Sequence, residues 1–182
     1  MPEPLRTLDP RAACTELVRR WLGRFGPGTV SDLTWWTGLT AGKVKAALAA
    51  IRPLEVDLDG TTGLVLPGDD KPEPSPEPWA ALLPALDPTV MGWKERDWYL
   101  GEHSPALFDR SGNAGPTVWW DGRVVGAWAV RRSGEVAFRL LEDVGADALA
   151  AIEAEAERLA VWLGETRVVP RFPTPLAREL AS

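Results

Sequence analysis

The chain has 182 residues, 45% of them hydrophobic and 25% charged, an ordinary composition for a globular protein with a buried core. Its net charge of −6 at pH 7 argues against a free-standing, non-specific nucleic-acid-binding protein. No apolar run reaches the roughly 18 residues of a membrane span, and the N-terminus lacks the apolar stretch of a signal peptide. We therefore expect a cytoplasmic protein without membrane contact, whose single cysteine, Cys14, is a small buried residue.

Charge is distributed unevenly along the chain, which also contains many tryptophans. Residues 1–66 carry eight Lys and Arg against seven Asp and Glu, whereas residues 67–78 carry a net charge of −3 and residues 79–182 a net charge of −4. The ten Trp residues could stack on bases or sugars, but we expect most of them to fill the cores of small domains. Residues 1–66 are therefore the part of the chain that a nucleic acid would repel least.

The apolar periodicity predicts three helices, over residues 10–25, 29–36 and 40–51. Asp9 can cap the first, which has proline at its first position. Thr29 and Asp32 have the spacing of a capping box, and Thr40 can cap the third helix. We expect four apolar residues of these helices to share one core: Trp21, Trp36, Val44 and Leu48.

A hairpin follows the helices. Residues 54–58 alternate apolar and acidic side chains, Asp59 and Gly60 form a tight turn, and residues 64–66 return as the partner strand. Three short helices and a hairpin, with a glycine between the second and third helices, are the order of a winged-helix domain with a helix-turn-helix. We therefore predict a winged-helix domain over residues 1–66.

Residues 67–78, PGDDKPEPSPEP, predict an acidic, extended linker, because they offer almost nothing apolar to bury. The second domain, residues 79–182, shows a hairpin over 117–130 with an Asp121-Gly122 turn, and a third strand over 135–141. An amphipathic helix over about 145–163 and a last strand over 167–169 complete it. The pattern predicts the α+β class.

The third helix offers the first candidate for DNA contact. In a helix-turn-helix the second helix enters the major groove, and here its outward face presents Thr40, Lys43 and Lys45 among small residues. It has no Arg, Asn or Gln for a bidentate base contact, so the lysines would hold phosphates. A winged helix that serves only as a packing module stays an equal alternative.

The predicted turn at Arg131 and Arg132, helped by Arg123, is a second basic candidate, with a plain solvated turn as the alternative. The only histidine, His103, lacks the further ligands of a metal site. The sequence shows no hydrolase triad, carboxylate pair, phosphate loop or dinucleotide fingerprint. We therefore predict no catalytic residue, metal or cofactor in this chain.

Four segments carry a resemblance to a known family: LVRRWLGRFGPGTVSDLTWWTGL, LLPALDPTVMGWKERDWYL, FDRSGNAGPTVWWDGRVVGAWAV and AIEAEAERLAVWLG. They are similar to the C-terminal half of bacterial winged-helix DNA-binding proteins related to crosslink-repair DNA glycosylases. The resemblance covers about residues 5–180. It implies tandem winged helices followed by a β-barrel-like domain, which together hold duplex DNA in a concave channel.

The resemblance also implies what this chain lacks. The glycosylases of the family carry a pair of catalytic glutamines in their N-terminal part, and this sequence contains no Gln. We therefore expect the C-terminal portion of a DNA-repair protein without its catalytic part, against which further N-terminal winged helices pack. The alternatives are a winged-helix interaction module or transcription regulator without base excision, and, with the weakest support, an enzyme with a small-molecule substrate.

Overall fold

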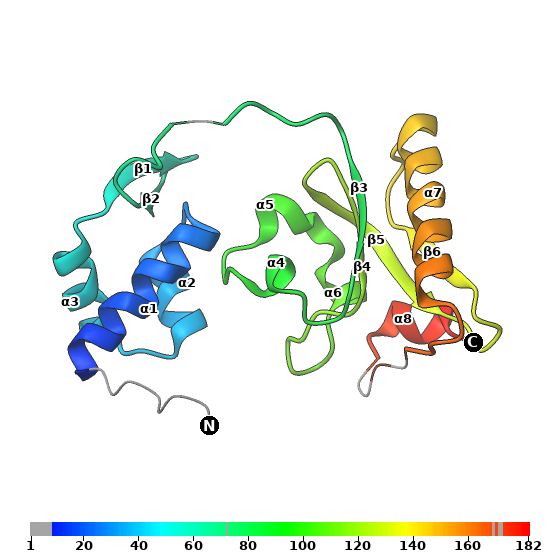
Figure 1. The fold of residues 1–182 in the computed structure, drawn as a ribbon, viewed down its shortest axis with the longest axis horizontal. Coiled ribbons are helices and arrows are strands. Elements are labelled where there is room, and N and C mark those ends of the chain that lie inside the picture. The colour runs from blue at the N-terminus through cyan, green and yellow to red at the C-terminus, as the bar shows by residue number, and fades with distance from the viewer. Residues whose placement is uncertain (1–8, 72, 169, 171–172) are drawn as a thin grey trace, which may run out of the picture. The chain divides into compact units, whose positions relative to one another are not determined.

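A computed structural model describes residues 9–71, 73–168, 170 and 173–182. The chain divides into two compact units (Figure 1). The first unit comprises the residues up to Pro74 together with Gly92–Glu95, and the second comprises Ser75–Met91 and Arg96–Ser182. Among the described residues, no helix is long and apolar enough to cross a membrane.

The first unit begins with three helices whose starts follow the local capping signals. They are α1 (Pro10–Phe25), α2 (Val30–Thr37) and α3 (Ala41–Ile51). The Asp9 carboxylate accepts hydrogen bonds from two backbone amides at the start of α1. Thr29 and Asp32 form the predicted capping box, and the Thr40 hydroxyl accepts a hydrogen bond from the amide of Lys43. The three predicted helices are confirmed to within one or two residues.

The hairpin of the first unit consists of β1 (Leu54–Leu58) and β2 (Thr61–Val65), which pair antiparallel. Asp59 and Gly60 both have positive φ, as a two-residue hairpin turn requires. With so short a turn, the return strand begins at once, at Thr61. The prediction that the partner strand covers 64–66 was therefore wrong at its start, because the threonines pair through their backbone although their side chains are not apolar.

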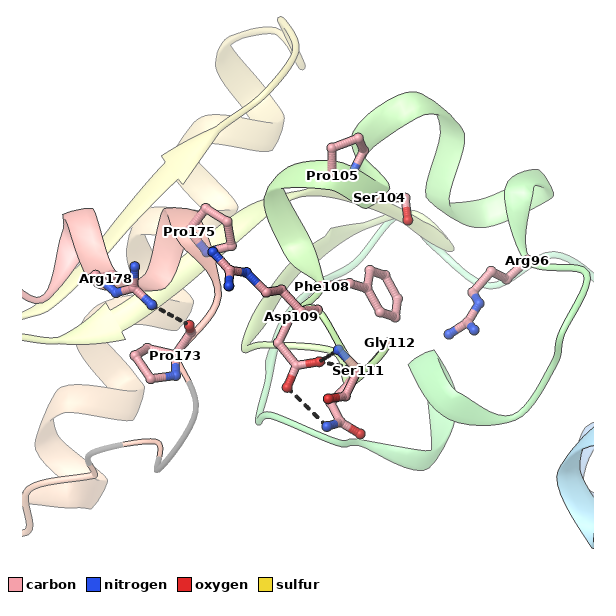
Figure 2. Close-up of a pocket in the computed structure, with 12 residues that line it drawn as sticks. Arg96, Ser104, Pro105, Phe108, Asp109, Ser111, Gly112, Pro173, Pro175 and Arg178 are labelled. Atoms are coloured by element: carbon pink, nitrogen blue, oxygen red, sulfur yellow. Dashed lines mark hydrogen bonds between the residues drawn. The ribbon is translucent and has the colours of Figure 1, made fainter.

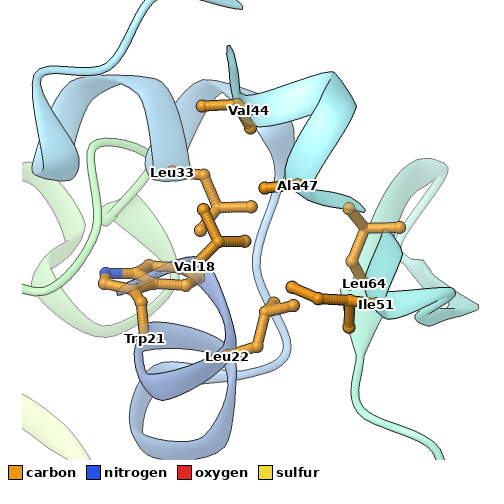
Figure 3. Close-up of a cluster of buried hydrophobic side chains, with 8 residues drawn as sticks. All are labelled: Val18, Trp21, Leu22, Leu33, Val44, Ala47, Ile51 and Leu64. Carbon is orange, nitrogen blue, oxygen red and sulfur yellow. The ribbon is translucent and has the colours of Figure 1, made fainter. Parts of the chain in front are cut away.

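The core of the first unit joins all three helices to β2 (Figure 3). Its buried members are Val18, Trp21, Leu22, Leu33, Val44, Ala47, Ile51 and Leu64. Leu48 packs against this cluster, but Trp36 is 41% exposed, so the prediction that Trp36 lies in the core was wrong. Leu33 supplies the buried side chain of the short helix α2, and the Trp36 ring tilts against Phe25 at the margin. Cys14 is half-buried rather than buried.

The segment Gly92–Glu95 completes the first unit, although it lies far along the sequence. The Trp93 indole N–H donates to the carbonyl oxygen of Phe25 over 2.9 Å, and the two rings meet edge to face with centroids 5.4 Å apart. The amides of Lys94 and Glu95 both donate to Oδ1 of Asp32. The sequence pattern did not predict that this segment belongs to the first unit, because the segment has no regular secondary structure.

The second unit contains a four-stranded antiparallel sheet in the order β3-β4-β5-β6. Its strands are β3 (Ala80–Leu83), β4 (Thr117–Trp120), β5 (Arg123–Val130) and β6 (Val136–Leu140). The predicted Asp121-Gly122 turn joins β4 to β5, and both residues have positive φ. The described strands form an open sheet with β3 and β6 at its edges, so a closed barrel is not formed. β3, which had not been recognised as a strand, pairs with β4.

The amphipathic helix α7 (Ala146–Leu163) covers one face of this sheet (Figure 1). Ile152 and Ala156 on α7 pack with residues of all four strands, among them Trp128, in a second hydrophobic core. The helix is confirmed as predicted, but the strand over 167–169 was wrong for its described part. The chain instead turns after the helix, where the amide of Thr166 donates to the carbonyl oxygen of Leu163, while Val169 lies outside the described residues.

Short helices fill the rest of the second unit. They are α4 (Pro88–Met91), α5 (Asp97–Leu100), the 3₁₀ helix η1 (Gly101–His103), α6 (Ser104–Leu107) and α8 (Pro175–Leu180). Tyr99 of α5 is buried; its hydroxyl donates to the carbonyl oxygen of Val90, and its ring stacks on Trp119. None of these helices exceeds six residues, which is too short for an apolar period to predict them.

Candidate nucleic-acid interface

The outward face of α3 carries the first predicted site. Thr40 acts as the cap of the helix, while Lys43 and Lys45 are exposed and form no ion pair with a described carboxylate. Because successive helix residues turn by about 100°, the two lysines point to opposite sides of the outward face. Between them lie Gly42 and Ala46, both exposed. The face is thus a smooth strip with one ammonium group on each side.

The second predicted site does not form as expected. Arg123 begins β5 and Arg131 follows its last residue, so eight residues of extended strand separate them by roughly 25 Å. The structure therefore does not bring Arg123 to the turn at Arg131 and Arg132. Arg131 also forms an ion pair with Glu135 over 2.9 Å, whereas Arg132 is exposed at the turn between β5 and β6.

Arg123 instead belongs to a cluster with His103 and Glu142. Nε2 of His103 lies 3.0 Å from Oε2 of Glu142, and Nη2 of Arg123 lies 3.4 Å from the same carboxylate. No sequence motif indicates this pair, because 39 positions separate the histidine from the glutamate. No three His, Cys, Asp or Glu side chains in the described part of the chain are placed to hold a metal ion.

The second unit also contains a pocket of about 1080 Å³ that sequence reasoning missed (Figure 2). Three arginines line it, together with small polar side chains, prolines and Phe108; the arginines are Arg96, Arg110 and Arg178. The Arg96 guanidinium lies over the Phe108 ring, 4.7 Å from its centroid. Figure 2 shows Phe108 and Asp109 between Arg96 and Arg178. The arginines are too far apart in sequence for any motif to have joined them.

The loop that carries Arg110 is held by its neighbour Asp109. The Asp109 carboxylate accepts hydrogen bonds from the amide of Ser111 and from the amide and side-chain nitrogen of Asn113 (Figure 2). These bonds, above all the one from the Asn113 amide, hold the pKa of Asp109 below its ordinary value. Gly112 takes a positive φ at the tip of the loop. Hydrogen bonds within the loop therefore hold the segment that carries Arg110, which lines the pocket.

The chain is similar to proteins of known function over most of its length. Residues 1–162 match the family of AlkZ-like DNA glycosylases, and the chain belongs to that family. The resemblance that the sequence segments carry is thus confirmed.

Two relatives illustrate the match. The chain is 26% identical over 173 residues to an interstrand DNA cross-link repair glycosylase of Streptomyces sahachiroi, covering 90% of this chain and 46% of that protein. The solved structure of Streptomyces sahachiroi DNA glycosylase AlkZ superimposes with a TM-score of 0.76 at 23% identity, again over 90% of this chain and 46% of that one. The chain therefore spans about half the length of the relatives it matches and shares their fold over that half.

Proposed function

We propose that this chain is a DNA-binding part of a DNA-repair protein of the glycosylase type, and that it works in the cytoplasm on double-stranded DNA. The first unit acts as a winged helix, with α3 as the helix that meets the duplex. The observation that carries the proposal is the outward face of α3, where Lys43 and Lys45 flank a strip of small residues. Membership of the glycosylase family supports DNA as the partner.

The composition of this face favours contact with the phosphate backbone over base reading. Gly42 and Ala46 allow the helix to approach a groove closely, and a Cβ added at Gly42 would meet nothing within 4 Å. The two ammonium groups then reach phosphates on either side. Nothing on α3 offers the planar fork of Arg, Asn or Gln that discriminates bases. We therefore expect binding with little sequence preference.

Base excision is assigned to residues outside this chain. The catalytic glutamine pair that the family resemblance implies has no counterpart here, because the sequence contains no Gln. The relatives are about twice as long as this chain, which leaves room for further winged helices that pack against it and carry the chemistry. The chain itself then supplies DNA contact and no cofactor chemistry.

A second function is favoured by the same strip on α3. Small residues on a helix also allow close packing against another helix, so the first unit would then serve as an interaction module. The two functions place the lysines in different surroundings. On DNA the phosphates would neutralise Lys43 and Lys45, whereas a packed helix would bury both charges without a phosphate partner.

A salt titration separates these functions. The chain is titrated with a fluorescent DNA duplex at several salt concentrations, and log K is plotted against log salt. Contact with phosphates gives a slope of about −0.9 per neutralised phosphate, with weak affinity because the whole chain carries −6. Absence of binding at low salt would reject DNA contact and leave the interaction module as the function.

A further inference from the structure

The arginine-lined pocket of the second unit gathers positive charge within an acidic chain. Arg96 precedes α5, Arg110 lies in the loop after α6, and Arg178 belongs to α8. Among the described lining residues, Asp109 is the one with a carboxylate. Three segments that are distant in sequence therefore bring three guanidinium groups and one described carboxylate to one pocket.

The Asp109 carboxylate forms no ion pair with Arg110 or Arg178. The carboxylate oxygens of Asp109 accept hydrogen bonds from the amides of its own loop and from the Asn113 side chain. Arg110 and Arg178 form no ion pair with a described carboxylate; Arg178 donates only to the carbonyl oxygen of Pro173, over a long 3.4 Å. Both side chains are exposed, so their guanidinium groups are available to an anionic ligand.

Shape and chemistry narrow the class of that ligand. A volume of about 1080 Å³ is at or above the roughly 300–1,000 Å³ of pockets for drug-sized molecules, so a single small anion would leave it largely empty. The guanidinium fork matches phosphate oxygens in pairs. Phe108 and three lining prolines add apolar surface against which sugars can pack. An extended chain of phosphates and sugars satisfies all three features.

We propose that this pocket, defined by Arg96, Arg110 and Arg178, binds phosphodiester groups of a DNA strand, as a contact additional to α3. The proposal rests on the proposed function of DNA binding, which names the partner. It adds a binding site in the second unit that uses different residues from the turn at Arg132. An acidic peptide would present carboxylates in place of phosphates and is the competing ligand that the experiment must distinguish.

The test compares the whole chain with its Arg110→Ala/Arg178→Ala variant by fluorescence anisotropy on a short duplex and on its single strand. Losing two phosphate contacts should weaken duplex binding about 60-fold near 0.1 M salt and flatten the salt slope by about 2. Arg110→Lys/Arg178→Lys should keep the slope and weaken binding a few-fold, because it keeps the charge but loses the fork. The control Arg20→Ala/Arg158→Ala removes the same charge from exposed helix faces and should change affinity less than twofold. Circular dichroism checks that each variant is folded.

Each outcome bears on the assignment. Wild-type affinity in a folded Arg110→Ala/Arg178→Ala variant, while the wild-type chain binds DNA, would overturn the pocket alone and leave the proposed function standing. A wild-type chain that binds no DNA would overturn both. Equal loss of binding to polyglutamate and to DNA would replace the nucleic acid by an acidic peptide as the ligand. A larger loss on the single strand than on the duplex would support the site and identify the single strand as its source of phosphates.

Discussion

The backbone amide of Lys94 donates a hydrogen bond of 2.8 Å to Oδ1 of Asp32, 62 positions earlier in the chain. The other oxygen of Asp32 accepts from the amide and hydroxyl of Thr29, so one buried carboxylate serves both the start of α2 and the returning segment. Asp32 is only 1% exposed. The Asp32 side chain therefore joins the two pieces of sequence that form the first unit.

Replacement of Asp32 by alanine should destabilise the first unit by about 3 kcal/mol, because the amides of Thr29, Lys94 and Glu95 would lose their hydrogen-bond acceptor. Hydrogen exchange should show faster exchange of the amides of Lys94 and Glu95 in this variant. The control Asp57→Ala removes an exposed bond to the amide of Gly60 and should cost less than about 1 kcal/mol. Unchanged protection of both amides in the Asp32 variant would contradict the role assigned to this carboxylate.

Replacement of Lys43 and Lys45 by alanine should flatten the plot of log K against log salt by about 2 units on duplex DNA, since each phosphate contact contributes about 0.9. The preference for DNA sequence should stay unchanged, because we expect both lysines to contact phosphates and neither to form a bidentate hydrogen bond with a base. The Arg20→Ala/Arg158→Ala variant again controls for lost charge. An unaltered slope and affinity would mean that α3 does not meet DNA, and the first unit would be better described as a packing module.

The chain by itself should release no base from alkylated or crosslinked duplex DNA, even at concentrations at which it binds the duplex. The measurement is the appearance of abasic sites, detected by strand cleavage in alkali. Any detected excision would refute the assignment of base excision to residues outside this chain. Nε2 of His103 lies 3.0 Å from Oε2 of Glu142, close enough for proton transfer, so loss of that excision in His103→Ala would identify the histidine as a participant.

The loop from Asp109 to Asn113 should lose its order only at acid pH. Because hydrogen bonds lower the pKa of Asp109 from its ordinary 3.8, its stabilising contribution is complete above about pH 4 and disappears as the pH falls through the lowered value. The NMR shifts of the Ser111 and Asn113 amides should therefore titrate together below pH 4. In Asp109→Asn the same shifts should show no such titration, and a transition above pH 5 in the wild-type chain would contradict this linkage.

The local elements were predictable because short-range interactions decide them. The cap of α1 at Asp9, the capping box of α2 and the Asp-Gly turn between β4 and β5 each involve residues within a few positions of one another. The amphipathic period of α7 extends over 18 residues and is unambiguous. The family was predictable as well, because long segments of sequence carry it.

What the sequence by itself determined was thus the position of the long helices and of the two Asp-Gly hairpin turns, and the family to which the chain belongs. Tertiary structure decided the rest: that Gly92–Glu95 belongs to the first unit, that Trp36 lies outside the core, and that the four strands form an open sheet. It also decided which charges meet, pairing His103 with Glu142 and bringing Arg110 and Arg178 to one pocket. The physical reason is that these contacts join residues tens of positions apart, whose meeting depends on how whole elements pack and leaves no periodic pattern in the sequence.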